Sequence, residues 1–363
     1  MIHREGKMEI SAQVRWGIVG TGAMAELFAQ ALARVKGAVL YGVSSRRSES
    51  ADAFAARFGF SHSYRSSDEL VQDPAIDIVY VATRNQYHRE DSLAAINSDK
   101  SVLCEKPFAL SAAEGRDIVE AARRRSVFCM EAMWMRFSPA VREVIDTVRS
   151  GGLGTPVFLS AQLGFPIEFD PLHRVFVRPG GGALFDLGVY PLSFAHALLG
   201  PPIQIKSVAC IGPTDVDDQV TAVLGYKSGC QAVVAASLRT RLANAAAIHG
   251  SDGILDSVEP LYFPDRYRLL KRIVHTPAKI RPQNRLSSLP QRVWARLVRG
   301  LQGDAPAGKV MRHCVADGYA CEAAAVQRCL QKGLLESPEM PLDESLDVLE
   351  SMDDIRSQWS GKT

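Results

Sequence analysis

Short apolar runs alternate with helix-forming stretches over the first third of the chain. The apolar runs lie at residues 14–19, 38–43, 76–82 and 101–104. The helix-forming stretches follow them in turn, at residues 23–35, 48–58, 88–97 and 112–125. Short apolar runs that stop at a glycine or a polar residue are typical of buried strands. Because strands that alternate with helices form parallel sheets, the pattern predicts a doubly wound α/β domain.

The pattern changes near residues 137–154. Beyond them come longer strand-like runs, several joined by short turns, and consecutive strands of this kind predict an antiparallel sheet. These runs are residues 156–163, 205–211, 219–226 and 231–238, and helical stretches follow at 318–333 and from residue 343. We therefore expect a polar leader (1–13), an α/β domain (14–136) and an α+β domain with a large, mostly antiparallel open sheet (137–363).

Residues 264–300 are strongly basic, and Asp265 is the single acid among them. The basic residues are Arg266, Arg268, Lys271, Arg272, Lys279, Arg281, Arg285, Arg292, Arg296 and Arg299. We interpret residues 264–312 as a basic insertion, either solvated or mobile, with a docking surface for an acidic partner as the alternative.

The composition narrows the class of protein. Of the 363 residues, 47% are hydrophobic and 23% are charged, which excludes disordered, collagen-like and coiled-coil chains. The net charge of +2 does not favour nucleic acid or a membrane surface as a partner, so we expect a small molecule. No apolar run approaches the ~20 residues that a membrane span needs. Residues 1–13 lack the apolar core of a signal peptide, so the expected compartment is the cytoplasm.

The sequence does not predict a metal site or a disulfide framework. The seven cysteines are odd in number and scattered, and none forms a C-x-x-C pair, which favours reduced and mostly buried thiols. No H-E-x-x-H and no G-x-S-x-G pattern is present. Hydride transfer without a metal is then the simplest redox chemistry.

A glycine-rich turn joins the first strand to the first helix. Residues 20–25 read GTGAMA, and their place between a strand and a helix is what makes a G-x-G-x-x-A pattern informative. The first glycine forms the turn, the second lets a pyrophosphate approach the backbone, and Ala25 permits close packing of helix and sheet. The turn predicts a dinucleotide site, with a purely structural turn as the alternative. The expected cofactor contacts are Gly20, Thr21, Gly22, Ala23 and Met24.

The end of the second strand distinguishes between cofactors. Dehydrogenases that prefer NAD normally carry Asp or Glu there, which binds the ribose 2′-hydroxyl and repels a 2′-phosphate. This chain carries Ser44, Ser45, Arg46 and Arg47 instead, and hydroxyl and guanidinium groups bind phosphate. We expect Ser44, Ser45 and Arg46 to contact the cofactor, and NADP(H) to be preferred over NAD(H). Two exposed loop arginines are the alternative.

Residues 102–107 read VLCEKP, so a buried strand ends in Glu105, Lys106 and Pro107. A lysine at the C-terminal edge of a doubly wound sheet lies where ligands bind, and proline restricts the turn that presents it. Taken alone, the segment suggests that Glu105 and Lys106 lie at the edge of the sheet where a cofactor binds.

Four ordered motifs together resemble the glucose-fructose oxidoreductase / inositol dehydrogenase (Gfo/Idh/MocA) family. They are the glycine turn, residues 82–88 (ATRNQYH), the VLCEKP segment and residues 180–190 (GGGALFDLGVY). Residues 133–139 (MWMRFSP) and Tyr190 look most like the branch of dimeric dihydrodiol dehydrogenases and NADP-dependent xylose dehydrogenases. The resemblance covers roughly residues 14–256 and returns at 318–359, without the basic segment.

The resemblance implies a Rossmann fold for residues 14–136 and assigns roles to individual residues. Thr83, Asn85 and His88 match the loop beneath the nicotinamide ribose. Lys106 matches the lysine that contacts both nicotinamide and substrate, and Asp186 and Tyr190 match a D-x-x-x-H/Y pair that holds the acid/base residue. Inositol dehydrogenases usually have histidine at the second position and a further acid after it. This chain has Tyr190 and Phe194 there, which argues against an inositol substrate.

The spacing of Asp186 and Tyr190 suits proton transfer, because residues four apart share one face if Gly188 begins or continues a helix. Oxidation of an alcohol needs a base while hydride leaves carbon, and reduction needs the same group as an acid. A free tyrosine, with a pKa near ~10, is a poor base at neutral pH. A neighbouring ammonium such as that of Lys106 is expected to lower this pKa. A helix-capping Asp, a core Tyr and a solvated Lys are the structural alternatives.

Further residues are candidates for the substrate wall and the cofactor edge. Trp134 and Phe165 can stack on a sugar or an aromatic ring, and Arg174 can bind hydroxyls or a carboxylate. Trp134 and Arg136 are also expected near the cofactor, with a structural role for Arg136 as the alternative. His173 is expected at the surface.

These observations predict an oxidoreductase that transfers hydride between NADP(H) and a hydroxyl or carbonyl carbon of a sugar or cyclic diol. Tyr190 is the expected acid/base and Lys106 its assistant. The alternatives are a lyase or glycosidase that uses tightly bound NAD(P) as a transient redox centre, and a non-catalytic NADP-binding sensor. Residues 219–226 and 231–238 carry apolar side chains on both faces of their predicted sheet. A homodimer, or a dimer of dimers, that pairs through this sheet is therefore expected.

Overall fold

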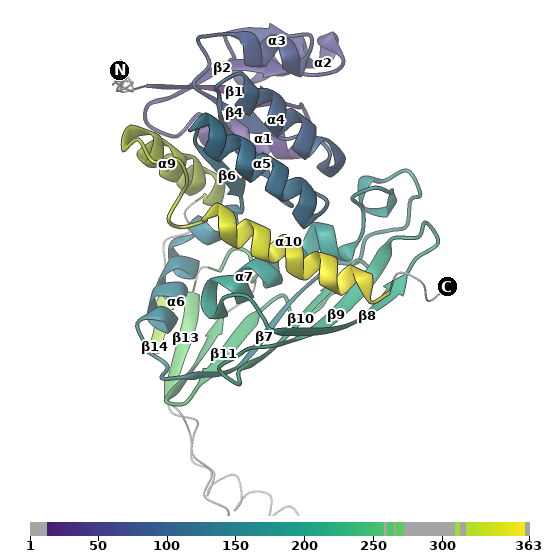
Figure 1. Ribbon diagram of the computed structural model, residues 1–363, viewed down its shortest axis with the longest axis vertical. Coiled ribbons are helices and arrows are strands. Elements are labelled where there is room, and N and C mark those ends of the chain that lie inside the picture. Colours follow the sequence, from purple (N-terminus) through teal and green to yellow (C-terminus); the bar gives the residue numbers. More distant parts are fainter. Residues whose placement is uncertain (1–12, 258–259, 265, 272–308, 313–316, 360–363) are drawn as a thin grey trace, which may run out of the picture.

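The computed structural model describes residues 13–257, 260–264, 266–271, 309–312 and 317–359 (Figure 1). Residues 1–12 of the predicted leader and 272–308 of the basic segment lie outside the described residues.

The first part of the chain forms a six-stranded sheet in the order β3-β2-β1-β4-β5-β6, and every pairing in it is parallel. Its strands are β1 (Val14–Val19), β2 (Ala38–Ser44), β3 (His62–Tyr64), β4 (Ile78–Val81), β5 (Ser101–Glu105) and β6 (Cys129–Ala132). The helices and short turns around it are α1 (Ala23–Leu32), α2 (Ser48–Phe58), α3 (Ser67–Gln72), η1 (Asn85–Tyr87), α4 (His88–Asn97), α5 (Ala112–Arg125) and η2 (Trp134–Phe137). This is the predicted doubly wound arrangement.

The strand order reverses between β1 and β4, which is where open α/β sheets bind their ligands. The loops after these two strands touch at this point. Gly20 has a φ of +110°, and a Cβ on it would lie 2.6 Å from the carbonyl oxygen of Ala82. Only glycine fits here, so the predicted turn is also the contact between the two loops.

The second part of the chain forms an eight-stranded sheet in the order β14-β13-β12-β11-β7-β10-β9-β8. Its strands are β7 (Pro156–Gly164), β8 (Gln204–Ile211), β9 (Asp217–Gly225), β10 (Gln231–Ser237), β11 (Ala246–Gly250), β12 (Gly253–Ser257), β13 (Arg266–Lys271) and β14 (Lys309–Arg312). The helices and turns are α6 (Pro139–Arg149), η3 (Arg174–Phe176), η4 (Leu184–Gly188), α7 (Val189–Leu199), α9 (Gly318–Gln331) and α10 (Leu342–Ser357). All pairings are antiparallel except that between β7 and β10, which is parallel.

The ends of the basic segment differ from the prediction of a solvated or mobile insertion. Residues 266–271 pair with β12, and residues 309–312 pair with them in turn, so both extend the sheet. Tyr267 is 2% exposed on the inner face, and Arg268 forms an ion pair with Asp256 across the strands. The alternation of aromatic or aliphatic residues with arginines is therefore the period of a half-buried strand.

Helix α10 joins the two parts of the molecule and lies between them in Figure 1. It packs against α5 on one side and α7 on the other. Its Asp353 accepts a hydrogen bond from Ala112 N at 2.8 Å, and Arg356 donates to the carbonyl of Leu110 at 3.1 Å. Its Glu344 forms an ion pair with Arg136 of η2, the turn that follows β6.

In the described part of the chain, no helix combines the length and the apolar character of a bilayer span. The six cysteines of this part are free thiols, and Cys104, Cys129, Cys230 and Cys329 are buried. The seventh, Cys314, lies outside the described residues.

Candidate active site

The glycine turn offers uncapped donors at the N-terminus of α1. Gly22 is the N-cap of this helix, no side chain caps it, and no atom lies within 4 Å of where its Cβ would be. Gly22 and Ala23 are exposed, whereas Ala25 is fully buried against the sheet. Free N–H groups and the positive end of a helix dipole bind anions, so the turn fits the pyrophosphate of a dinucleotide.

The end of β2 lies beside this turn. Ser44 is fully buried and its carbonyl accepts a hydrogen bond from Gly20 N at 2.9 Å, so its hydroxyl does not face the surface. Ser45 Oγ lies 3.4 Å from Thr21 Oγ1. Arg46 is exposed, donates to the hydroxyl of Tyr87 at 3.2 Å, and lies over its ring at 4.9 Å. Ser45 and Arg46 are therefore accessible beside the turn, whereas the Ser44 side chain is not.

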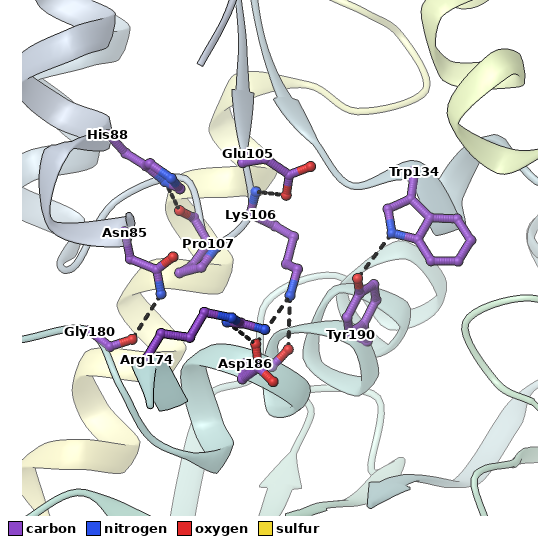
Figure 2. Close-up of polar contacts among 10 residues, drawn as sticks. All are labelled: Asn85, His88, Glu105, Lys106, Pro107, Trp134, Arg174, Gly180, Asp186 and Tyr190. Atoms are coloured by element: carbon purple, nitrogen blue, oxygen red, sulfur yellow. Dashed lines mark hydrogen bonds and ion pairs between the residues drawn. The ribbon is translucent and has the colours of Figure 1, made fainter. Parts of the chain in front are cut away.

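The loop after β4 connects the cofactor side to the rest of the site. His88 is fully buried, and its two ring nitrogens lie 2.8 Å from the carbonyl of Pro107 and 3.1 Å from that of Thr83. Burial lowers the pKa of His88 against the opposing effect of these carbonyls. Asn85 donates to the carbonyl of Gly180 at 2.8 Å, across to the second part of the chain (Figure 2).

Lys106 sits on a turn held by buried carboxyls. Its backbone N–H donates to Glu105 Oε2 at 3.0 Å, and Glu105 also accepts from the hydroxyl of Tyr80. Phe108 N donates to Glu131 Oε1 at 3.1 Å. Glu105 is 3% exposed and faces inward, so it acts in this arrangement as a support of the turn.

Asp186 and Tyr190 come from one continuous helical segment. Leu184–Gly188 forms a π-helical turn that leads into α7, so Gly188 continues a helix as the spacing required. Lys106 Nζ donates to the carbonyl of Asp186 at 2.9 Å and lies 3.9 Å from its Oδ1. The same ammonium lies 4.8 Å from the centre of the Tyr190 ring. Figure 2 shows the three side chains meeting between the two parts of the molecule.

The charges in this cluster support one another. Burial raises the pKa of Asp186, but Lys106 and Arg174 more than offset this and keep its pKa below the ordinary value. Burial lowers the pKa of Lys106, whereas Tyr190, Asp186 and Glu105 raise it to a net value above the ordinary one. At neutral pH the pair is therefore a carboxylate and an ammonium.

Lys106 lowers the pKa of Tyr190 as expected, but the net pKa is raised, which differs from the expectation. Burial raises this pKa, and the opposing effect of Lys106 and of the hydrogen bond from Trp134 does not reverse the rise. Trp134 Nε1 donates to the Tyr190 hydroxyl at 3.0 Å. The reason for the correction is that Tyr190 is 7% exposed, and a phenolate loses its hydration there.

Arg174, Phe165 and Arg136 take different places around this cluster. Arg174 Nη1 lies 2.7 Å from Asp186 Oδ1, and its side chain is 55% exposed at the rim. Phe165 contacts the ring of Tyr262 at 6.2 Å. Arg136 is 1% exposed and bonds Ser193 and Glu344, which are contacts of a structural residue; its part in cofactor binding stays a prediction. His173 is exposed.

Three aromatic residues beside the cluster were not singled out from the sequence. Tyr319 stacks on Trp134 at 5.0 Å, Phe263 contacts Trp134 at 5.7 Å, and Tyr262 lies 6.0 Å from the Tyr190 ring. In the sequence, two of them form the aromatic pair Tyr262-Phe263 between Pro260 and Pro264, and this pair is the signal that could have revealed them. The wall next to Tyr190 is thus more aromatic than the sequence suggested.

The described residues contain no cluster of three His, Cys, Asp or Glu that could hold a metal ion. The groups around Asp186 and Tyr190 are Lys106, Arg174 and the aromatic side chains of Trp134 and Tyr262.

Known families and relatives match the chain along most of its length. Residues 14–133 match the profile of an oxidoreductase family with an NAD-binding Rossmann fold (GFO_IDH_MocA), and residues 141–256 match the C-terminal domain of the same family. The trans-1,2-dihydrobenzene-1,2-diol dehydrogenase of Bos taurus is 32% identical over 349 residues, which cover 94% of this chain and 96% of the relative. The enzyme of Homo sapiens is 30% identical over 351 residues, with the same coverage.

Solved structures share the whole fold. Levoglucosan dehydrogenase in complex with NADH and levoglucosan superposes with a TM-score of 0.79 at 19% identity, over 97% of this chain and 98% of that one. A 3-ketoreductase from Actinomadura kijaniata in complex with NADP and TDP-benzene gives 0.78 at 22% identity, over 95% and 98%.

The family profiles cover the six-stranded sheet and most of the eight-stranded one, and the relatives of at least 30% identity span nearly all of the chain. This protein belongs to the Gfo/Idh/MocA family and is an NAD(P)-dependent oxidoreductase.

Proposed function

We propose that this enzyme is an NADP(H)-dependent dehydrogenase or reductase that acts on a hydroxyl or carbonyl carbon of a sugar or cyclic diol. The observation that carries the proposal is the meeting of Lys106, Asp186 and Tyr190 at the edge of the sheet that bears the glycine turn. The relatives named above act on a cyclic diol, and the structural neighbours are described with sugars or a nucleotide-linked compound. The substrate class follows from these names and from the aromatic wall.

The residues of the chain divide the chemistry between them. Gly22 would hold the pyrophosphate and Arg46 the 2′-phosphate of NADP(H), which would supply or accept the hydride. Tyr190 gives its hydroxyl proton to a carbonyl oxygen during reduction and takes it back during oxidation. Trp134 donates to the Tyr190 oxygen and stabilises the phenolate as it forms. Lys106 lies over the same ring and favours the same charge.

Asp186 fixes the ammonium that assists this proton transfer. Its backbone carbonyl accepts from Lys106 Nζ, and its carboxylate lies between Lys106 and Arg174. The proton on Tyr190 at neutral pH suits the direction of reduction, because the phenol is already the acid that a carbonyl needs.

A substrate panel tests the proposed function. Aldoses, keto-sugars and cyclic diols are incubated with NADP(H) and with NAD(H) in parallel, and the absorbance of the reduced cofactor is followed. We expect turnover with at least one class, and Lys106→Ala serves as the matched inactive control. Cofactor that stays bound and cycles without net change would instead indicate the lyase or glycosidase alternative.

The preference for NADP(H) is proposed from Ser45 and Arg46. We expect at least a tenfold preference, which corresponds to about 1.4 kcal/mol of binding free energy. Arg46→Ala should remove most of it, and Arg47→Ala, on the neighbouring exposed residue, is the control. Calorimetry that finds NAD(H) bound as tightly as NADP(H) would contradict this proposal.

A homodimer, or a dimer of dimers, is proposed through the outer face of the large sheet. The residues of this face include Val208 at 76% exposure, Val223 at 43% and Val310 at 46%. They lie on three different strands, and exposed apolar area on a sheet favours association. Light scattering at micromolar concentration should report the dimer or tetramer, and a monomer would refute the proposal.

A further inference from the structure

A buried carboxyl from the second sheet holds the π-helical turn that carries Asp186. This carboxyl belongs to Asp217, the first residue of β9, which is 6% exposed. Its Oδ2 accepts a hydrogen bond from Leu184 N at 2.7 Å. Leu184 lies two residues before Asp186 and opens the turn, so the bond is made where the π-helix begins.

The approach of Asp217 to this segment is close. Gly182 has a φ of +114°, and a Cβ on it would lie 2.1 Å from Asp217 Oδ1. Any other residue at 182 would push the carboxyl away from Leu184 N. The glycine run at 180–182 thus makes room for the carboxyl as well as for the chain reversal.

The loop before β9 also holds the segment that carries Arg174. Arg178 Nε donates to the carbonyl of Asp215 at 2.6 Å, and Gly182 N donates to the carbonyl of Val175 at 2.8 Å. The backbone carbonyl of residue 215 thus contacts the segment that follows Arg174, and the side chain of Asp217 contacts the turn that carries Asp186.

The burial of Asp217 has a physical cost that its hydrogen bond offsets. Burial raises its pKa to about 7, while the Leu184 N–H acts to lower it. The charged groups that face it are Arg356 of α10, which lowers this pKa, and Asp218 of its own strand, which raises it. A buried polar group is costly unless it is paired, so this carboxyl is best explained by the backbone donor that it binds.

The position of the turn matters directly to Lys106. Lys106 Nζ donates to the backbone carbonyl of Asp186, and not only to its side chain. A rotation of the peptides between Leu184 and Asp186 would remove that acceptor, even with all three side chains present. Tyr190 follows on the same helical segment and would move with it.

We propose that Asp217 is a positioning residue of the oxidoreductase: its hydrogen bond to Leu184 N sets the π-helical turn and thereby the contact of Lys106 with the carbonyl of Asp186. The proposal rests on the function proposed above. It assigns the coupling of the large sheet to the reacting groups to one side chain.

Two substitutions of Asp217 separate the hydrogen bond from general stability. Asp217→Asn keeps an oxygen that can accept from Leu184 N, whereas Asp217→Ala leaves this N–H unpaired. We expect kcat to fall at least tenfold in Asp217→Ala and to stay within threefold of wild type in Asp217→Asn. The KM for NADP(H) should stay within threefold in both, because the glycine turn is not involved. Asp215→Asn, which changes an exposed carboxyl on the same loop, is the control and should behave as wild type.

Three results would overturn the proposal. They are a folded Asp217→Ala protein with wild-type kcat, an equal loss of kcat in Asp217→Asn, and a loss that falls on the KM for cofactor alone. If Asp217→Ala does not fold, Gly182→Ala provides the second test, since its Cβ displaces the carboxyl. It should lower kcat at least tenfold with cofactor affinity retained, and wild-type kcat would contradict the proposal.

A structural readout keeps this test independent of the proposed function. If the wild-type enzyme turns over no substrate of the panel, the proposed function fails, and crystal structures of Asp217→Ala and Asp217→Asn decide the positioning role. We expect the 2.9 Å contact of Lys106 Nζ with the Asp186 carbonyl to open in the first variant and to persist in the second. An unchanged Leu184–Gly188 turn in Asp217→Ala would refute the positioning role.

Discussion

The Lys106 turn and the Asp186 turn meet at the active site. In each, a buried carboxyl accepts a backbone hydrogen bond, but the two turns differ in their further contacts. In the Lys106 turn, Glu131 accepts a backbone hydrogen bond two residues after the lysine, from Phe108 N. In the Asp186 turn, Asp217 accepts one two residues before the aspartate, from Leu184 N. Burial raises the pKa of both supporting carboxyls to about 7.

The difference lies in the number of supports. The Lys106 turn follows β5, and its Glu131 lies on the neighbouring strand β6. Two further hydrogen bonds hold this turn: Lys106 N donates to Glu105, and a ring nitrogen of His88 bonds the carbonyl of Pro107. The Asp186 turn is a π-helix, a rare form that is frequent at functional sites. The pairing of β5 with β6 fixes the place of the Lys106 turn. The Asp186 turn lies outside the sheets, and the hydrogen bond from Leu184 N to Asp217 connects it to the second one.

Removing either of the two proposed catalytic side chains should have the largest effect. We predict that Lys106→Ala and Tyr190→Phe each lower turnover by two or more orders of magnitude, since general acid/base help is typically worth this much. Cofactor affinity, measured by fluorescence titration, should stay within a few-fold. Turnover within threefold of wild type in both variants would remove the mechanism.

Removing the support of each turn should sharpen the comparison. Because the Lys106 turn has other supports, Glu131→Ala should lower kcat by only roughly threefold, against at least tenfold for Asp217→Ala. Glu131→Gln, which keeps an acceptor for Phe108 N, is the matched control. Steady-state kinetics on the three variants measure this, and an equal loss in Glu131→Ala and Asp217→Ala would show that the two turns depend equally on their carboxyls.

The pH dependence tests how the two turns act together on Tyr190. Because burial raises the pKa of Tyr190, the phenol is protonated at neutral pH. Oxidation, which needs the phenolate, should therefore speed up as pH rises toward that pKa, while reduction holds at neutral pH and falls in alkali. Lys106→Met removes the ammonium that opposes the rise, so its oxidation profile should move to higher pH by on the order of one unit. An oxidation rate that falls as pH rises from neutrality would contradict the role of Tyr190.

The pH dependence of stability tests the two supporting carboxyls themselves. Glu131 and Asp217 have folded-state pKa values of about 7, whereas unfolded Glu and Asp titrate near ~4. Between about pH 4 and about pH 7 the unfolded chain is deprotonated at these groups while the folded protein is not. The contribution of each group to the free energy of unfolding is therefore fully present below about pH 4 and is lost as the pH rises through about 7. Urea unfolding at about pH 5 and about pH 7 should show a smaller difference in Glu131→Gln and Asp217→Asn than in wild type, by on the order of 2 kcal/mol each. An unchanged difference would mean that these groups titrate normally.

Several elements were predictable from the sequence because their cause is local. The strands before Gly20 and Lys106 are apolar runs stopped by turn residues, and both appear where they were expected. The strand β6 was missed because the buried Glu131 interrupts a four-residue apolar run. Strands β13 and β14 were taken for part of an insertion because the sequence around them is rich in basic residues. Their pairing, of β13 with β12 and of β14 with β13, is what makes them part of the sheet.

The sequence by itself determined which residues are candidates for the chemistry, since Lys106, Asp186 and Tyr190 were chosen from the order of the family's motifs and a four-residue spacing. Tertiary structure decided how they work. The burial of Tyr190 raises a pKa that the sequence predicted to fall, because desolvation depends on the residues that cover the ring, among them Trp134 and Tyr262. The support from Asp217 could not be predicted either, because its distance to Leu184 is set by the packing of a helical turn on a sheet, and no local pattern encodes that contact.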